Sequence, residues 1–185
     1  PDYTASLEAS TEGACEDGAC EPEHEVQAST DFAQCARSGA KDCGTLPAIG
    51  ATEWLNSLGE PHGTVTLVDF WSSSCVNCAR EIPEVERIYE KYKDAGLVVI
   101  GVHSPQQAHE REASVVSGAA SRLGITYPVA LDPELEAFKA YGANAWPTHY
   151  LAGPDGQLRS MGRGTSGLEE QIRTLLTEAG ASLPN

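Results

Sequence analysis

The clearest pattern in the chain is an apolar run followed by a helical repeat. Residues 65–71 (VTLVDFW) are mostly apolar, β-branched or aromatic, and Asp69 is their only charged member. This composition is typical of a buried parallel strand. From residue 76 to about 93, apolar side chains recur every three or four positions between charged ones, which predicts an amphipathic helix. The recurring apolar residues are Ala79, Ile82, Val85, Ile88, Tyr89 and Tyr92.

Further apolar runs follow at intervals that suit alternating strands and helices. Two parallel strands joined by a helix form a right-handed unit, and Asp155-Gly156 is a favoured hairpin turn. The pattern therefore predicts an α/β domain over residues 46–185. Its further strands are expected at about 97–102, 128–130, 148–151 and 158–163.

Local signals mark where the other helices begin. Ser104 precedes Pro105, which fits an N-cap followed by a first-turn proline. Ser166 and Glu169 fit a capping box. Pro83 lies inside the helix predicted after residue 76, and we expect it to kink the axis. The further helices are expected at about 104–123, 133–141 and 166–179, with one helical turn at 54–58.

Residues 1–45 have a different composition and form a separate region. Residues 1–44 hold ten acidic and two basic residues, so they carry −8 of the net charge of −15. Such a segment buries too little apolar surface to order itself. We therefore expect an irregular extension that disulfides hold in place.

Four cysteines lie in this extension and allow three pairings. Pairing between neighbours in sequence favours Cys15–Cys20 and Cys35–Cys43. A metal site that uses these thiols with His24 is an alternative. However, the spacing lacks the paired Cys-x-x-Cys of structural zinc sites.

Charge and cysteine usage narrow the functional classes. The chain has 27 Asp and Glu against 12 Lys and Arg, and such a surface repels nucleic acid and anionic lipid. It contains no apolar run of about 18 residues, so we expect no membrane insertion of this fragment. It begins at Pro1 without Met, and we expect that an export signal or anchor has been removed. Six cysteines, an even count, fit an oxidising compartment.

Cys75 and Cys78 lie where the strand meets the helix. The first turn of a helix has free N–H groups and the positive end of the helix dipole, which favour an anion. A thiolate is such an anion, so this place lowers the pKa of a thiol. We expect Cys75 to attack a partner disulfide and Cys78 to resolve the mixed disulfide. A structural disulfide or half of a zinc site are the alternatives, but no second Cys-x-x-Cys is present.

Two long segments resemble one family of redox proteins. The runs LVDFWSSSCVNCAREIPEVERIYEKYKDAGLVVIGVHSP and LGITYPVALDPELEAFKAYGANAWPTHYL resemble TlpA-type thiol–disulfide oxidoreductases, in particular the redox domain of DipZ-type proteins. The resemblance covers about residues 47–176. It implies a thioredoxin fold, which is a central mixed sheet flanked by helices, with a TlpA-type insert.

The same resemblance implies an activity and its setting. The expected reaction is disulfide exchange outside the cytoplasm with protein thiols and disulfides and with an upstream electron donor or acceptor protein. No metal and no organic cofactor are expected. Family members often carry a bulky aromatic residue before the first cysteine, where this chain has Ser74, so the surface that docks partners is expected to differ.

The resemblance also assigns roles around the cysteines. Asp69 matches the buried aspartate of thioredoxin-like proteins. Burial raises the pKa of a carboxyl group, which suits a general base that takes the proton of Cys78; a hydrogen-bonded residue at a strand end is the alternative. A cis Trp146–Pro147 bond is expected to face Cys75 and to expose backbone that pairs with an extended substrate.

Four further residues are considered near the dithiol. Trp71 is expected to pack beside it, unless it is an ordinary core tryptophan. Glu81 matches a glutamate common in TlpA-type proteins and is expected to tune the thiol pKa, with a solvated helix-face role as the alternative. His103 and His149 flank the ends of predicted strands, where a histidine near a dithiol would shift its reduction potential. A structural role is the more common outcome for such a histidine, and the sequence does not decide between the two.

Two other functions fit parts of this sequence. A thiol peroxidase on the same fold needs Ser or Thr three residues before its reactive cysteine and Pro seven before it. Ser72 meets the first requirement, but Val68 fails the second. A copper-delivery module would bind Cu(I) through Cys75, Cys78 and a histidine such as His149, since soft thiolates suit Cu(I).

Overall fold

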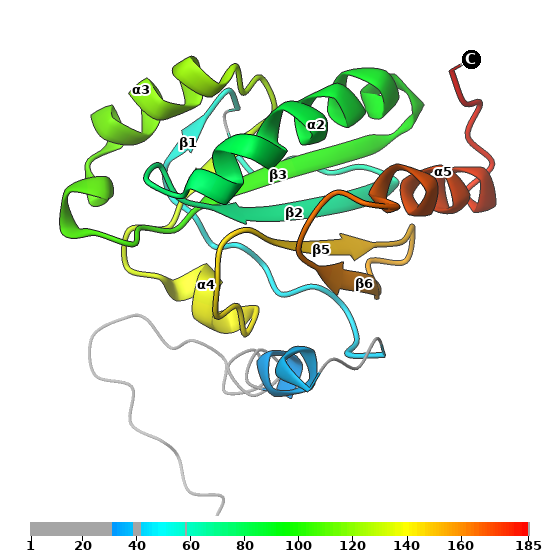
Figure 1. Ribbon diagram of the computed structural model, residues 1–185. Helices are drawn as coiled ribbons and strands as arrows, with labels where there is room; N and C mark the ends of the chain where they lie inside the picture. The colour runs from blue at the N-terminus through cyan, green and yellow to red at the C-terminus, as the bar shows by residue number, and fades with distance from the viewer. Residues whose placement is uncertain (1–30, 39–41, 58, 185) are drawn as a thin grey trace, which may run out of the picture.

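A six-stranded mixed sheet forms the centre of the protein in the computed structural model, which describes residues 31–38, 42–57 and 59–184. Its strand order is β1-β4-β3-β2-β5-β6 (Figure 1). β2 runs parallel to β3 and antiparallel to β5, so the sheet is mixed, as expected. The strands are β1 (Trp54–Leu55), β2 (Val65–Trp71), β3 (Leu97–His103), β4 (Val129–Leu131), β5 (Thr148–Ala152) and β6 (Leu158–Gly162).

Helices cover both faces of this sheet (Figure 1). α2, α3 and α5 bury their apolar sides on the face that carries Leu67 and Trp71, while α4 packs on the face that carries Phe70. Within the described part of the chain, no helix is long and apolar enough to cross a membrane. The helical elements are α2 (Val76–Tyr92), η1 (Lys93–Ala95), η2 (Ala108–Arg111), α3 (Ala113–Leu123), α4 (Glu136–Ala140) and α5 (Leu168–Glu178).

Part of the N-terminal extension is folded, although its composition predicts an irregular segment. Residues 31–37 are helical, and Phe32 and Ala36 lie in the core below the sheet with Tyr141 and Tyr150. A disulfide joins Cys35 to Cys43, the pairing favoured from the sequence. The expected Cys15–Cys20 pair and the alternative metal site with His24 lie outside the described residues.

Two local predictions were wrong because the residues concerned contact distant parts of the chain instead. Residues 54–55 form a strand, not a helical turn, and Trp54 pairs with Ala130 of β4. Ser104 caps no helix, because its hydroxyl donates to Asp132 Oδ2 at 2.9 Å and α3 begins only at Ala113.

The predicted capping box at Ser166 is also absent. Gly167 is the N-cap of α5, with a φ of 74° and no side-chain cap. Glu169 instead reaches α2, where it accepts a hydrogen bond from the Tyr92 hydroxyl at 2.7 Å and another from Arg87. These bonds tie α5 to α2.

Replacing Phe32 tests whether the helix at 31–37 belongs to the core. Phe32 is 3% exposed and packs on the Tyr141 ring at 5.7 Å, so Phe32→Ala is expected to lower the free energy of unfolding by about 3–5 kcal/mol. Denaturant titration with the disulfides intact measures this loss. Gln34→Ala, on the exposed side of the same helix, is the control. Equal stability of the two variants would mean that the helix is not part of the core.

Candidate active site

The two cysteines of the Cys-x-x-Cys motif form a disulfide at the start of α2. Cys75 is the N-cap of the helix, and its Sγ accepts a hydrogen bond from the Cys78 N–H at 3.1 Å. The chain reaches this point through residues 72–74, directly after β2. Cys78 is 1% exposed, whereas Cys75 is half-buried. One sulfur therefore lies nearer the solvent than the other.

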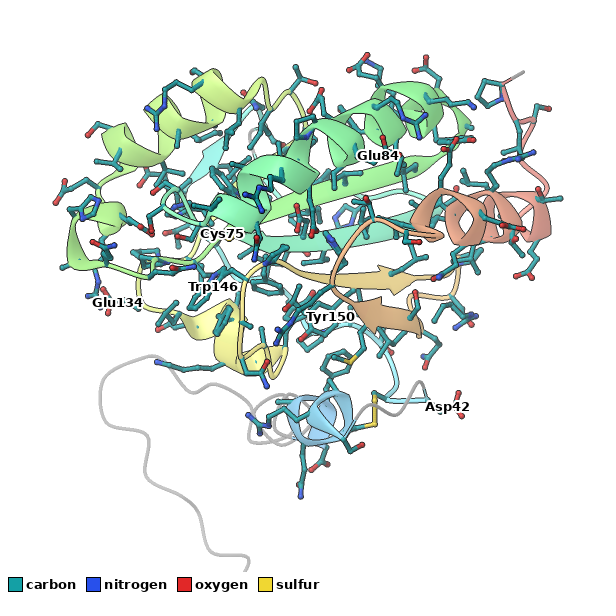
Figure 2. The ribbon with its side chains drawn as sticks, viewed as in Figure 1. Asp42, Cys75, Glu84, Glu134, Trp146 and Tyr150 are labelled. Atoms are coloured by element: carbon teal, nitrogen blue, oxygen red, sulfur yellow. A yellow bond between two sulfur atoms is a disulfide. The ribbon has the colours of Figure 1, made fainter. Side chains whose placement is uncertain are left out.

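Apolar side chains surround the disulfide at this end of the sheet. Val76 is 65% exposed, which is high for a large hydrophobic residue. Trp146 is half-buried and stacks on Phe138, with the ring centroids 4.5 Å apart. Figure 2 shows Cys75 and Trp146 at the same end of the molecule. The Trp146–Pro147 bond is cis. Trp71 is fully buried in the core cluster that also contains Cys78.

A line of three ionisable side chains runs below α2. Asp69 on β2 pairs in register with His149 on β5, and Asp69 Oδ1 lies 3.1 Å from His149 Nδ1. The two groups form an ion pair at a distance suited to a hydrogen bond, although they are not aligned for a linear one. The other ring nitrogen, Nε2, lies 3.2 Å from Oε2 of Glu81 on α2. The histidine ring thus lies between two carboxylates.

The two carboxylates determine the charge of His149. Burial lowers the pKa of a histidine, but the nearby charge of Asp69 and the contacts with Glu81 outweigh burial here, and the pKa of His149 is raised. The structure therefore favours an imidazolium that carries a proton on both ring nitrogens.

A second buried network holds the loop that precedes Cys75. Glu110 of η2 is fully buried, and its Oε2 accepts hydrogen bonds from the Ser72 hydroxyl at 2.6 Å and the Gln106 N–H at 3.0 Å. The Ser73 N–H donates to His103 Nε2 at 3.1 Å. Residues 72–74 are thus fixed by a carboxylate and an imidazole from two different elements.

Burial and hydrogen bonding together set the pKa values of these two groups, and both pKa values are lowered. Burial would raise the pKa of Glu110, but hydrogen bonds from Ser72, Ser74 and Gln106 lower it. Burial lowers the pKa of His103 from 6.5 to about 4. His103 is therefore neutral at pH 7, which its role as a hydrogen-bond acceptor requires.

The structure places Cys75, Cys78, Trp71 and Trp146 in one core cluster. It also links Asp69 to Glu81 through His149. The sequence left the role of His149 open, yet the side chain contacts both carboxylates. The position of His149 two residues after Pro147 points to this contact only when the pairing of β2 with β5 is known. Glu110 carried no signal, because it stands in the charged segment His109-Glu110-Arg111-Glu112. In the part of the chain that the structure describes, no three His, Cys, Asp or Glu residues are grouped to hold a metal ion.

Comparison with known proteins places this geometry in a family. Residues 46–161 match the AhpC/TSA family. The chain is 38% identical over 206 aligned residues to "Protein DipZ" of Mycobacterium bovis; the alignment covers all of this chain but 29% of that protein. The chain therefore spans less than a third of that relative's length.

Shorter relatives align over most of their length. "Thiol-disulfide oxidoreductase YkuV" of Bacillus subtilis is 31% identical over 139 residues, which cover 70% of this chain and 91% of that protein. Among solved structures, a thioredoxin-like protein in the oxidized form is 29% identical with a TM-score of 0.65, covering 73% of this chain and 96% of that one.

The buried histidine that holds Ser73 gives a pH-dependent prediction. Between pH 6.5 and about 4 the unfolded chain protonates His103 while the folded protein does not, so this residue lowers stability as pH falls through that window. The loss approaches about 3 kcal/mol at full effect. His103→Gln keeps an acceptor for the Ser73 N–H but cannot titrate.

Unfolding free energies of the wild type and His103→Gln, measured by denaturant titration from pH 7.5 to 4, test this. The difference between the two proteins should move in favour of the variant as pH falls. A difference that is independent of pH would show that His103 does not stay neutral in the folded protein.

Proposed function

The chain belongs to the AhpC/TSA family, and from this premise we propose that it is a thioredoxin-like thiol–disulfide oxidoreductase with Cys75 and Cys78 as its redox dithiol. The observation that carries the proposal is the disulfide at the N-terminus of α2, with Cys75 half-buried and Cys78 buried. The proposed reaction is exchange of disulfides with protein partners outside the cytoplasm.

The reaction begins at the more accessible sulfur. In the reduced protein, the Cys75 thiolate attacks one sulfur of a partner disulfide, and the other partner sulfur leaves as a thiolate. The helix N-terminus stabilises the Cys75 thiolate through free N–H groups and the helix dipole. A mixed disulfide between Cys75 and the partner results.

Resolution uses the buried cysteine. Cys78 loses its proton and attacks the Cys75 sulfur, which releases the second partner thiolate and closes the Cys75–Cys78 disulfide. Two electrons have then passed from the dithiol to the partner. Asp69 is the proposed base for Cys78, because it is a buried carboxylate on the face of β2 that lies against α2.

The apolar surface around Cys75 is the proposed docking area for partners. Val76, next to Cys75 in the chain, is exposed and Trp146 is half-buried, and exposed hydrophobic and aromatic side chains are common where proteins bind each other. Ser74 is also exposed and adds no bulk, so the approach to Cys75 is open on that side. A second, upstream protein would restore the starting redox state of the dithiol.

A compartment outside the cytoplasm is supported by the second disulfide. A disulfide joins Cys35, on the helix at residues 31–37, to Cys43 after it, and structural disulfides persist where the surroundings are oxidising.

Neither alternative function gains support from the site. A peroxidase would need the Ser72 hydroxyl near its reactive thiol, but this hydroxyl donates to Glu110. A Cu(I) site would need a free nitrogen on His149, but both ring nitrogens face carboxylates.

Removing one cysteine at a time tests the order of events. Cys78→Ser should form a stable mixed disulfide with a small disulfide reagent through Cys75, because the resolving thiol is missing. Cys75→Ser should react far more slowly, because Cys78 is buried. Mass spectrometry of the trapped adducts, with rates taken by stopped flow, distinguishes the two. Faster reaction at Cys78 would reverse the assigned roles.

Replacing the proposed base tests the resolution step alone. Asp69→Asn keeps the shape of the side chain but cannot take a proton, so resolution by Cys78 should slow on the order of 10²-fold or more. Attack by Cys75 should be nearly unchanged, so mixed disulfide should accumulate near neutral pH. Single-turnover kinetics across pH measure both steps in one experiment. Unchanged resolution at every pH would return Asp69 to a structural role.

A further inference from the structure

The side chains of Asp69, His149 and Glu81 form a line that runs from a buried position to the surface. The side chain of Asp69 is 2% exposed and that of His149 is 5% exposed, but the Glu81 side chain is 23% exposed. Each ring nitrogen of His149 faces a different carboxylate. The three groups come from β2, β5 and α2, so the fold, and not one local segment, brings them together.

A proton that Asp69 takes from Cys78 would be held in this sealed position. Besides His149, the ionisable groups here are Asp69 from β2, Glu81 from α2 and Tyr127, and the nearby charge of Asp69 acts on the Tyr127 hydroxyl. Burial raises the pKa of Tyr127 well above its ordinary value, so the phenol keeps its proton. His149 is the member of this group that contacts both the buried acid and a carboxylate at the surface.

We propose that His149 couples the buried acid to the surface: when Asp69 takes the proton of Cys78, His149 releases a proton through Glu81 to water. This inference rests on the proposed roles of Cys78 and Asp69 and adds a proton-transfer role for His149. Nothing in the motif around the cysteines calls for a histidine at this point.

The protons balance in each step. At rest, Asp69 is a carboxylate and His149 an imidazolium with protons on Nδ1 and Nε2. Cys78 gives its proton to Asp69 and becomes the attacking thiolate. The Nε2 proton of His149 passes to Oε2 of Glu81 and then to water, while the Nδ1 proton stays in place facing Asp69. One proton leaves the dithiol site, and one proton reaches the solvent.

This coupling keeps the buried pair neutral. Before the transfer, the pair consists of a carboxylate and an imidazolium; after it, of a carboxylic acid and a neutral imidazole. A poorly paired charge in a buried site is costly, and protonation of Asp69 without a change in His149 would leave the imidazolium with only the partly exposed Glu81 carboxylate as its partner. The raised pKa of His149 agrees with an imidazolium at rest.

The reverse reaction resets the site. When a donor reduces the Cys75–Cys78 disulfide, Asp69 returns its proton to the Cys78 thiolate, and a proton from water passes through Glu81 to Nε2 of His149. The same path therefore serves oxidation and reduction.

His149→Gln is the central test, because glutamine is polar and similar in reach but cannot carry a proton between the carboxylates. With a small disulfide reagent, resolution by Cys78 should slow on the order of 10²-fold near neutral pH. The proton released in that step, followed with a pH indicator dye, should be delayed to the same extent. Attack by Cys75, measured in a Cys78→Ser background, should change less than about twofold, since it depends on the helix terminus.

Glu81→Gln and the double variant separate a proton path from a packing effect. Glu81→Gln changes only a half-exposed side chain and should also slow resolution. The double variant should be no slower than His149→Gln alone, because residues on one path are not additive. Glu84→Gln removes the same charge one turn along α2, from a side chain that is 40% exposed and pairs with Arg87 (Figure 2), and it should leave resolution unchanged.

Each outcome decides one point. Normal resolution and proton release in both His149→Gln and Glu81→Gln would overturn the coupling and leave the proposed function intact. If His149→Gln fails to fold, Glu81→Gln decides alone. If Cys75 of the Cys78→Ser protein does not attack disulfides at all, the proposed function fails, and this result is separate from any effect at His149.

Discussion

Strand β2 is hydrogen-bonded along both edges, and the position of the reactive residues depends on its register. Parallel pairing with β3 and antiparallel pairing with β5 set Asp69 beside His149 on the face below α2. Because side chains alternate along a strand, a slip of one residue would turn Asp69 to the other face. There it would meet the ring cluster around Phe70. The end of β2 also delivers the chain to Cys75.

Two carboxylates, Asp69 and Glu110, are buried in the fold, and their partners differ. Glu110 receives hydrogen bonds from Ser72 and from a backbone N–H, which hold it as an anion that fixes a loop. Asp69 instead faces a histidine whose charge is able to change. A carboxylate held by fixed donors suits support, whereas one paired with a titratable group suits proton transfer. Glu110 is therefore placed to support the loop, and Asp69 is placed for the proton transfer proposed above.

The sequence was informative where local pattern and tertiary packing agree. The apolar run of β2 and the helical repeat of α2 are both found at the predicted bounds to within a residue. Local signals failed where a distant partner competed for the side chain, as Asp132 did for Ser104. The meeting of Asp69 and His149 depends on the pairing of strands 80 positions apart in sequence, and no local pattern carries it. Acid-rich composition concealed the few buried positions of the helix at 31–37.

The helix at residues 31–37 belongs to the folded domain, although it precedes the family match. The family match begins at residue 46, but Phe32 packs against the rings of both Tyr141 and Tyr150. The backbone of Ala33 lies against Gly142, leaving no room for a side chain there. A recombinant chain that begins at residue 46 would lack Phe32 and would leave the rings of Tyr141 and Tyr150 uncovered on that side. Contiguous exposed apolar surface favours aggregation, so we expect the solubility of the domain to depend on residues that precede the family match.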